Sequence, residues 1–308
     1  MRVAVIDLGT NTCNLLIADI HNNNYEILHQ SKQLVGLGDD KIKDNEISDA
    51  ATERAVAAFK IHQQICTEFE AERVYAIATS AVRDAANKIP FLERLGEETG
   101  WLVRVVSGEG EAELIFKGVL LAFDQLKSPT VILDIGGGSN ELILAHYKAL
   151  LWKESRPTGM ARVINRFRLS DPILPEETET LQQYFAAEHS HAIAQCKQAG
   201  VALLVGCSGA FDTVVDMLDD VEPGTKARRM QSVSPEDFYR VYERLLKSTR
   251  EERLRLKSMD RVRVDLIVPA VILIETLVRE IGISRIVQTD FALREGVVFQ
   301  LLEKAANH

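Results

Sequence analysis

The chain has 308 residues, of which 46% are hydrophobic and 26% are charged, and its net charge at pH 7 is −9. A chain of this length favours about two domains, and its acidic balance argues against general nucleic-acid binding, which requires a basic face. Its apolar segments are too short to cross a bilayer, its first residues do not resemble a signal peptide, and its four cysteines form no CxxC pair. We therefore expect a cytoplasmic protein with reduced thiols that does not bind a membrane.

The first 127 residues are predicted to form an α/β domain that opens with three consecutive strands. Apolar runs bounded by turns indicate strands, and apolar residues at helical spacing, such as Ala55, Phe59 and Cys66, indicate a helix. The expected strands are 2–7, 12–19, 25–35, 73–78 and 102–106, and the expected helices are 48–69, a short segment after 78, 90–100 and 111–123.

The same order of elements restarts at Ser128-Pro129, which predicts a second α/β domain over 128–308. A capping box at Ser234 indicates the start of one of its helices. The last helix, about 291–308, is also a candidate to pack against the first domain. The other expected elements are strands 130–134, 141–146, 149–155, 201–206 and 284–290, and helices within 175–200 and 264–278.

Two stretches of the chain share one pattern. AVIDLGTNTCNLLI begins at Ala4 and VILDIGGGSNELIL begins at Val131, 127 positions later. An aspartate, a glycine and a hydroxyl residue coincide in this alignment: Asp7 with Asp134, Gly9 with Gly136, and Thr12 with Ser139. Each stretch is predicted to be a strand, a glycine loop and a second strand, so the repeat indicates two related domains.

A glycine loop after a strand is compatible with several structures. A P-loop requires GxxxxGK[ST], which the chain lacks. A dinucleotide fingerprint requires GxGxxG before a helix, whereas Gly136 and Gly138 precede the β-rich run ELILAHY. A tight hairpin would explain one such loop. Two loops in register, each with an aspartate before the glycine and a hydroxyl after it, favour phosphate binding.

Glycine loops allow backbone N–H groups to approach a phosphate closely. We therefore predict phosphate binding by two groups of residues, Gly9, Thr10, Asn11 and Thr12 in the first loop and Gly136, Gly137, Gly138, Ser139 and Asn140 in the second. Asp7 and Asp134, at the strand ends, are predicted to hold Mg²⁺, with Mn²⁺ as an alternative, directly or through water. This layout predicts an α/β fold of two ribonuclease-H-like domains, as in actin, sugar kinases and Hsp70 ATPases, with an interdomain cleft.

Two polar clusters have simpler explanations than a ligand site. His189-Ser190-His191 has the spacing of a metal-binding pair, but within a polar helix it is interpreted as solvent-exposed. The basic residues fit either contact with a polyanion or a solvated face: Lys153, Arg156, Arg162, Arg166 and Arg168.

Six stretches together resemble the exopolyphosphatase and guanosine pentaphosphate phosphohydrolase family over essentially the full chain. They are AVIDLGTNT from Ala4, ATSAVRDAAN from Ala78, VVSGEGEAELIFKGV from Val105, LDIGGGSNEL from Leu133, GCSGAFDTV from Gly206 and ALREGVV from Ala292. The chain is similar to the short, two-domain members, which lack the additional C-terminal helical domain of longer ones. The resemblance implies Mg²⁺-dependent hydrolysis of a terminal phosphoanhydride bond in inorganic polyphosphate or guanosine pentaphosphate.

The resemblance implies that Glu111, in the SGEGEAE stretch, activates the attacking water and that Glu141 helps to position the water or the metal. A carboxylate that acts as a general base raises the rate of hydrolysis about 10²–10⁴-fold, so a glutamate is a suitable residue for this role. The family usually has Glu where this chain has Gly110, and Glu109 is the candidate replacement. A solvent-facing strand position is the alternative explanation of Glu141.

The resemblance also implies phosphate contacts outside the glycine loops. Arg83, in TSAVR, matches a phosphate-binding arginine, with a lone surface arginine as the alternative. Gly206, Ser208 and Gly209 match residues that line the substrate channel, although a simple turn would also explain them. Asn140 stands where the family typically has Thr.

Two other classes of function fit the same fold. A kinase would need an acceptor pocket with an Asp base and an adenosine site, for which the sequence has no clear motif. A polyphosphate or alarmone sensor would keep the phosphate loops without catalysis, but the presence of both Glu111 and Glu141 favours an enzyme. Without the extra domain, short polyphosphates are favoured over long ones. The resemblance is compatible with a homodimer, although no sequence feature requires one.

Overall fold

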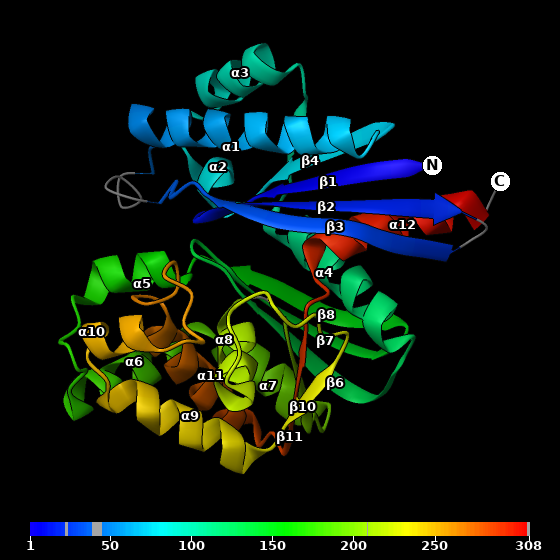
Figure 1. Cartoon of the computed structure of the whole chain (residues 1–308). Helices are drawn as coiled ribbons and strands as arrows, with labels where there is room; N and C mark the ends of the chain where they lie inside the picture. Colours follow the sequence, from blue (N-terminus) through cyan, green and yellow to red (C-terminus); the bar gives the residue numbers. More distant parts are fainter. Residues whose placement is uncertain (22–23, 39–44, 208, 307–308) are drawn as a thin grey trace. The chain divides into compact units, whose positions relative to one another are not determined.

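The structure is a computed structural model that describes residues 1–21, 24–38, 45–207 and 209–306, and it divides the chain into two units (Figure 1). Unit 1 comprises Met1–Leu121 and Leu293–His308, and unit 2 comprises Ala122–Ala292. The sequence predicts the boundary between the two domains at 127/128. In the structure unit 2 begins a few residues earlier, and the last helix belongs to unit 1.

Unit 1 contains a five-stranded mixed sheet in the order β3-β2-β1-β4-β5. Strands β1, β2 and β3 form an antiparallel meander, and β4 and β5 lie parallel to β1. The elements are β1 (Arg2–Leu8), β2 (Thr12–His21), β3 (Asn24–Leu34), α1 (Asp49–Glu68), β4 (Arg73–Ala78), α2 (Ser80–Asp84), α3 (Lys88–Thr99), β5 (Val103–Val105), α4 (Gly108–Phe123) and α12 (Leu293–Ala306).

Helices cover both faces of this sheet, with α1 on one face and α12 on the other (Figure 1). Helix α1 begins where the Ser48 side chain accepts a hydrogen bond from the backbone N–H of Ala51, and its apolar residues share one core with those of β1 and β2. Gly296 of α12 lies directly against α4, because a Cβ on it would be 1.9 Å from the carbonyl oxygen of Leu114. This close approach explains the glycine in the ALREGVV stretch.

Unit 2 contains a six-stranded mixed sheet in the order β10-β11-β9-β6-β7-β8. Its apolar helix α11 is buried over almost its whole length. The elements are β6 (Leu126–Ile135), β7 (Asn140–Tyr147), β8 (Ala149–Arg156), α5 (Met160–Phe167), α6 (Pro175–Glu188), α7 (Ser190–Gln198), β9 (Leu203–Cys207), α8 (Gly209–Asp219), β10 (Gln231–Val233), α9 (Pro235–Lys247), α10 (Arg250–Arg255), α11 (Ile267–Ile281) and β11 (Arg285–Thr289).

The two sheets share one strand topology. The order β3-β2-β1-β4-β5 in unit 1 corresponds to β8-β7-β6-β9-β11 in unit 2, where β10 is added at the edge. The core-facing positions also repeat 127 positions apart, since Ala4, Ile6 and Leu8 of β1 match Val131, Leu133 and Ile135 of β6. The prediction of two ribonuclease-H-like α/β domains is therefore confirmed.

The main differences from the predicted elements lie in unit 2. Strand β6 begins at Leu126 rather than at 130, with an irregular register before Thr130. The apolar helix runs over Ile267–Ile281 rather than 264–278. The four cysteines, predicted to be reduced thiols, are free, and all four are buried. Among the described residues, no helix has the length and apolar character needed to cross a bilayer.

Candidate functional site

Both glycine turns close with the same hydrogen bond. The backbone N–H of Gly9 donates to the carbonyl of Thr12, and that of Gly136 donates to the carbonyl of Ser139, each at 2.9 Å. A Cβ on Gly136 would lie 2.7 Å from the Ser139 oxygen, so this turn requires glycine. The internal repeat therefore extends from strand order to individual hydrogen bonds.

The carbonyl groups of the second glycine loop all face the start of helix α5. Three backbone N–H groups of that helix start donate to them: Met160 to Gly136 at 3.0 Å, Ala161 to Gly137 at 2.9 Å, and Gly159 to Gly138 at 3.4 Å. The contact is tight, because a Cβ on Gly159 would lie 2.4 Å from the Gly138 carbonyl carbon. A side chain at position 159 would therefore push the loop away from the helix.

This arrangement fixes the direction of the loop N–H groups. In a trans peptide the C=O and the following N–H point in opposite directions. The N–H groups of Gly137, Gly138 and Ser139 therefore point away from α5. Successive N–H groups on one side of a loop form a concavity that binds anions, so the geometry agrees with the predicted phosphate loop.

Glu141 is almost fully buried, with 1% of its surface exposed. Its Oε1 accepts hydrogen bonds from the hydroxyls of Ser139 at 2.8 Å and Ser155 at 2.6 Å. A solvent-facing position is therefore excluded. Glu141 lies directly opposite Asp134 in the β6–β7 pair, which places the two carboxylates side by side on one face of the sheet.

Asn140 has a different role from the predicted one. Its side chain is fully buried, and its Nδ2 donates to the Thr158 carbonyl at 2.7 Å and to the Thr158 hydroxyl at 3.0 Å. An amide nitrogen carries two hydrogens, so both are used within unit 2. Asn140 therefore anchors the loop, and its amide N–H groups are not directed to a phosphate.

The first loop is held by its own unit in a similar way. The Thr10 hydroxyl lies 3.3 Å from that of Ser80, at the start of α2. The Asn11 carbonyl accepts hydrogen bonds from the 35–36 segment. The Asn14 side chain donates to the Thr12 hydroxyl at 3.3 Å, just as Glu141 accepts from Ser139 at the matching positions of the second repeat.

Asp7 and the Asp134–Glu141 pair fit the chemistry of a divalent cation. Burial raises the pKa of Asp7 to about 6, although Arg294 and a hydrogen bond from Asn14 partly oppose this effect. A bound cation would favour the charged carboxylate. The described residues contain no cluster of three or more metal-ligating side chains, but Mg²⁺ commonly takes one or two carboxylates and completes its shell with water and phosphate.

Arg83 and Glu111 form an ion pair in unit 1. Arg83 lies in α2 and donates through Nη1 to Glu111 Oε2 at 2.8 Å, and Glu111, in the first turn of α4, is 8% exposed. Arg83 is therefore not a lone surface arginine. Glu109 is exposed, and a Cβ on Gly110 would lie 3.2 Å from the Ser107 hydroxyl. Glu111 is thus an acid of this stretch that the fold holds in place through Arg83.

Gly206 lies in β9 and Gly209 lies at the start of α8. Gly206, in β9, is covered by the ring of Phe211, because a Cβ there would lie 2.1 Å from a ring carbon. Gly209, at the start of α8, is covered by Arg263, whose Nη2 lies 1.7 Å from the position of a Cβ. Ser208 is outside the described residues. Arg263 was not among the predicted residues, because no local sequence pattern marks it.

The interpretation of His189-Ser190-His191 as solvated is wrong for its first member. His189 is fully buried between the Thr158 hydroxyl and the Glu154 carboxylate, each 3.3 Å from one ring nitrogen. His191 is exposed and lies edge-on to Trp152. The difference arises because α6 ends and α7 begins at this point, so one helical face does not continue through it.

The basic residues of 153–168 do not form a single solvated face. Arg156 pairs with Glu154 at 3.2 Å, and Arg162 donates through Nε to the Gly138 carbonyl at 3.1 Å. Arg166 lies over the Phe167 and Tyr184 rings, with its Cζ 5.3 Å and 4.8 Å from their centroids. Arg162 thus contacts the glycine loop itself, and Arg156 lies opposite Asn140 in the β7–β8 pair.

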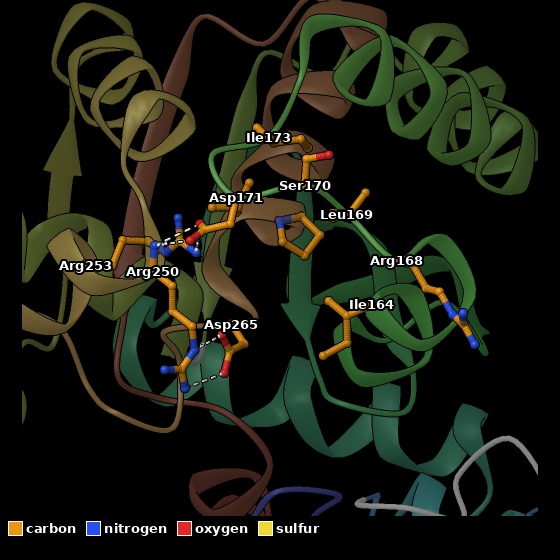
Figure 2. Close-up of a pocket in the computed structure, with 11 residues that line it drawn as sticks. Ile164, Arg168, Leu169, Ser170, Asp171, Ile173, Arg250, Arg253 and Asp265 are labelled. Atoms are coloured by element: carbon orange, nitrogen blue, oxygen red, sulfur yellow. Dashed lines mark hydrogen bonds and ion pairs between the residues drawn. The ribbon is translucent and has the colours of Figure 1, made fainter.

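A separate cavity of about 340 Å³ lies in unit 2 between the end of α5, segment 168–173, α10 and the start of α11 (Figure 2). Four of its five charged side chains pair with one another. Arg250 binds Asp265 at 2.7 Å, and Arg253 binds Asp171 at 3.2 Å (Figure 2). The predicted phosphate and metal ligands do not line it. The lining residues are Ile164, Arg168, Leu169, Ser170, Asp171, Ile173, Arg250, Arg253, Asp265, Val268 and Pro269.

The sequence matches known proteins over nearly its whole length. Exopolyphosphatase 2 of Mycobacterium tuberculosis is 28% identical, and the match covers 97% of this chain and 98% of that protein. A bifunctional 3-dehydroquinate synthase/phosphatase of Fusobacterium nucleatum is 26% identical over 97% of this chain, which spans 46% of that longer relative.

Solved structures agree with these matches. The crystal structure of an exopolyphosphatase from Cytophaga hutchinsonii is 34% identical and superposes with a TM-score of 0.94 over 99% of this chain and 98% of that one. The Aquifex aeolicus PPX-GPPA enzyme is 25% identical, with a TM-score of 0.82 over 97% of this chain and 99% of that one. The model of the Ppx/GppA phosphatase family matches residues 16–305. The chain therefore belongs to the Ppx/GppA phosphatase family.

Proposed function

We propose that the protein is an exopolyphosphatase, which hydrolyses the terminal phosphoanhydride bond of inorganic polyphosphate and releases orthophosphate. The observation that carries this proposal is the direction of the N–H groups of Gly137, Gly138 and Ser139, which all point away from α5 and offer a phosphate several donors at once. Membership of the family and similarity to proteins named exopolyphosphatases support this choice of substrate.

In the proposed reaction, Glu111 is the general base. A water attacks the terminal phosphorus in line with the bridging oxygen, and Glu111 takes a proton from it. The new P–O bond forms as the bridging P–O bond breaks, and the shortened polyphosphate leaves with the bridging oxygen. Little covalent help is needed for such a transfer, so positioning and electrostatic stabilisation carry most of the rate enhancement.

Arg83 is proposed to orient the Glu111 carboxylate and to bind phosphate oxygens. Its guanidinium holds the Glu111 carboxylate at 2.8 Å, which limits the directions that the carboxylate can take. An arginine has five N–H donors, so others remain to bind phosphate oxygens. Positive charge close to the transferred phosphoryl group stabilises the charge that develops in the transition state.

Mg²⁺ is the proposed cofactor, with Mn²⁺ as the alternative. Asp134 and Glu141, which are paired in unit 2, would hold it directly or through water. Asp7 is the corresponding predicted ligand in unit 1. The contribution of the metal would be to neutralise charge on the phosphate oxygens. The neighbouring carboxylates of Asp134 and Glu141 support this assignment, because two adjacent anions repel each other unless a cation or a proton lies between them.

Orthophosphate release should be measured with Mg²⁺ from short polyphosphate, long polyphosphate and guanosine pentaphosphate, with the Glu111→Gln variant as the control. We expect release from polyphosphate and its loss in the variant. Release from guanosine pentaphosphate alone would assign the nucleotide as substrate. No release from any of the three would contradict a phosphohydrolase. ATP consumption that depends on an acceptor would then indicate a kinase, and binding without turnover would indicate a sensor.

A further inference from the structure

Thr158 is attached to the second glycine loop at two points. It is 1% exposed, and both its carbonyl and its hydroxyl accept hydrogen bonds from Asn140, the residue with which the chain leaves the loop. The next residue, Gly159, lies directly under Gly137 and Gly138. A displacement of Thr158 would therefore move both the end of the loop and the surface on which the loop rests.

A buried histidine holds Thr158 from the other side. His189 is fully buried, with Nε2 3.3 Å from the Thr158 hydroxyl and Nδ1 3.3 Å from Glu154 Oε1. Because the Thr158 hydroxyl accepts from Asn140, its own hydrogen is available to donate to Nε2. In the tautomer that accepts this hydrogen on Nε2, Nδ1 carries the ring hydrogen and donates it to Glu154.

The far end of this chain of hydrogen bonds is also fixed. Arg156 donates through Nε to Glu154 Oε2 at 3.2 Å, so the carboxylate has one oxygen for the arginine and one for the histidine. The hydrogen bonds run in one direction, from Asn140 through Thr158 and His189 to Glu154. The Nδ2 of Asn140, the Thr158 hydroxyl and both ring nitrogens of His189 each have a partner in this chain, whereas the buried Oδ1 of Asn140 has none among the described residues, so the side chain of Asn140 is held through its nitrogen.

We propose that Thr158 and His189 are positioning residues, which hold the second glycine loop in the conformation whose N–H groups point away from α5. This inference rests on the proposed function, in which that loop binds the phosphate of the substrate. Apolar side chains of similar volume would fill the same space, so packing alone does not require this set of polar groups. The polar groups of Thr158 and His189 fix the orientation of the Asn140 side chain. They thereby fix the positions of its neighbours Ser139 and Glu141.

The test compares Thr158→Val, Thr158→Ser and a matched control. Valine keeps the shape and removes the hydroxyl, whereas serine keeps the hydroxyl. Thr276→Val is the control, because Thr276 is also fully buried but its hydroxyl donates only to the Ile272 carbonyl of its own helix. kcat, KM and Tm are measured for each protein on polyphosphate with Mg²⁺.

We expect Thr158→Val to lower kcat about 10- to 100-fold, the range seen when a residue that supports a metal ligand is removed. Thr158→Ser should retain most of the wild-type kcat, and Thr276→Val should lower Tm without a comparable loss of kcat. His189→Phe, which fills the ring position without nitrogens, should act like Thr158→Val. Equal kcat values for Thr158→Val and Thr276→Val would overturn the proposal.

A second readout separates this inference from the proposed function. If the wild type releases no phosphate from any substrate, the proposed function fails. The positioning role is then judged from amide hydrogen exchange of Gly137, Gly138 and Ser139. Faster exchange in Thr158→Val than in Thr158→Ser would support it, and equal exchange in both variants and the wild type would contradict it.

Discussion

Arg83 and Glu111 lie 28 positions apart in the chain, and their side chains meet at 2.8 Å. Helix α2 brings the arginine and the first turn of α4 brings the glutamate. The N-terminal end of α4 favours an acidic side chain through its dipole, so the ion pair and the helix end both favour a glutamate at position 111.

Glu111→Gln should lower kcat on polyphosphate by about 10²–10⁴-fold, because glutamine has nearly the same shape but cannot accept the proton. Substrate binding, measured by calorimetry, should change little. Glu109→Gln is the control, since Glu109 is exposed on the same turn. A larger loss of kcat in Glu109→Gln than in Glu111→Gln would move the base to Glu109.

Arg83→Lys should retain part of the activity, and Arg83→Met should retain much less. Lysine keeps the positive charge but lacks the fork of donors that allows arginine to hold Glu111 and a phosphate oxygen together. Steady-state kinetics should show a lower kcat in both variants and a higher KM in Arg83→Met. If the two variants have the same kinetics as the wild type, Arg83 has no role in the reaction.

Gly159→Ala should reduce phosphate release strongly, because the new Cβ would lie 2.4 Å from the Gly138 carbonyl carbon and must displace the loop. Gly96→Ala is the matched control. Gly96 lies within α3, where a Cβ would lie 3.8 Å from the Trp101 carbonyl oxygen, so alanine fits and should raise stability by about 0.5–1 kcal/mol. Thermal unfolding and kcat measured on both variants check this prediction, and normal kcat in Gly159→Ala would contradict it.

Asp212 should make folding stability depend on pH. Burial, with a further contribution from the nearby Asp290, raises the pKa of Asp212 to about 6 from an ordinary value of 3.8. The folded state therefore binds the proton more tightly than the unfolded state, and stability falls as the pH rises from about 4 to about 6. A shift of this size corresponds to at most about 3 kcal/mol.

Asp212→Asn should remove the loss of folding stability that ionisation of the buried carboxyl causes. The Tm of the variant should exceed that of the wild type increasingly as the pH rises through the same window, and the difference should level off above about pH 6. Asp220→Asn, at an exposed position after the same helix, should give a difference in Tm that does not vary with pH in this way. A constant difference for Asp212→Asn would mean that its carboxyl does not titrate in this range.

Much of the fold was predictable because its signals are local. Strand alternation, helical spacing and the glycines that follow two apolar strands are properties of neighbouring residues, and they are sufficient to predict that Asp7 and Asp134 occupy matching positions of a repeat. The shared hydrogen bond of the two turns follows from the same local pattern. Boundaries were less accurate where a strand continues through a proline, as β6 does at Pro129.

What the sequence determined by itself is thus the pair of α/β units, their glycine loops and the list of candidate side chains. The tertiary structure alone decided how those side chains are used. It turned the loop carbonyls toward α5, buried His189 beside Thr158, placed Arg263 over Gly209 and joined Arg83 to Glu111. Each of these contacts joins residues far apart in the chain, and the packing of whole helices and strands determines which residues meet. A short window of sequence does not contain the information needed to predict that packing.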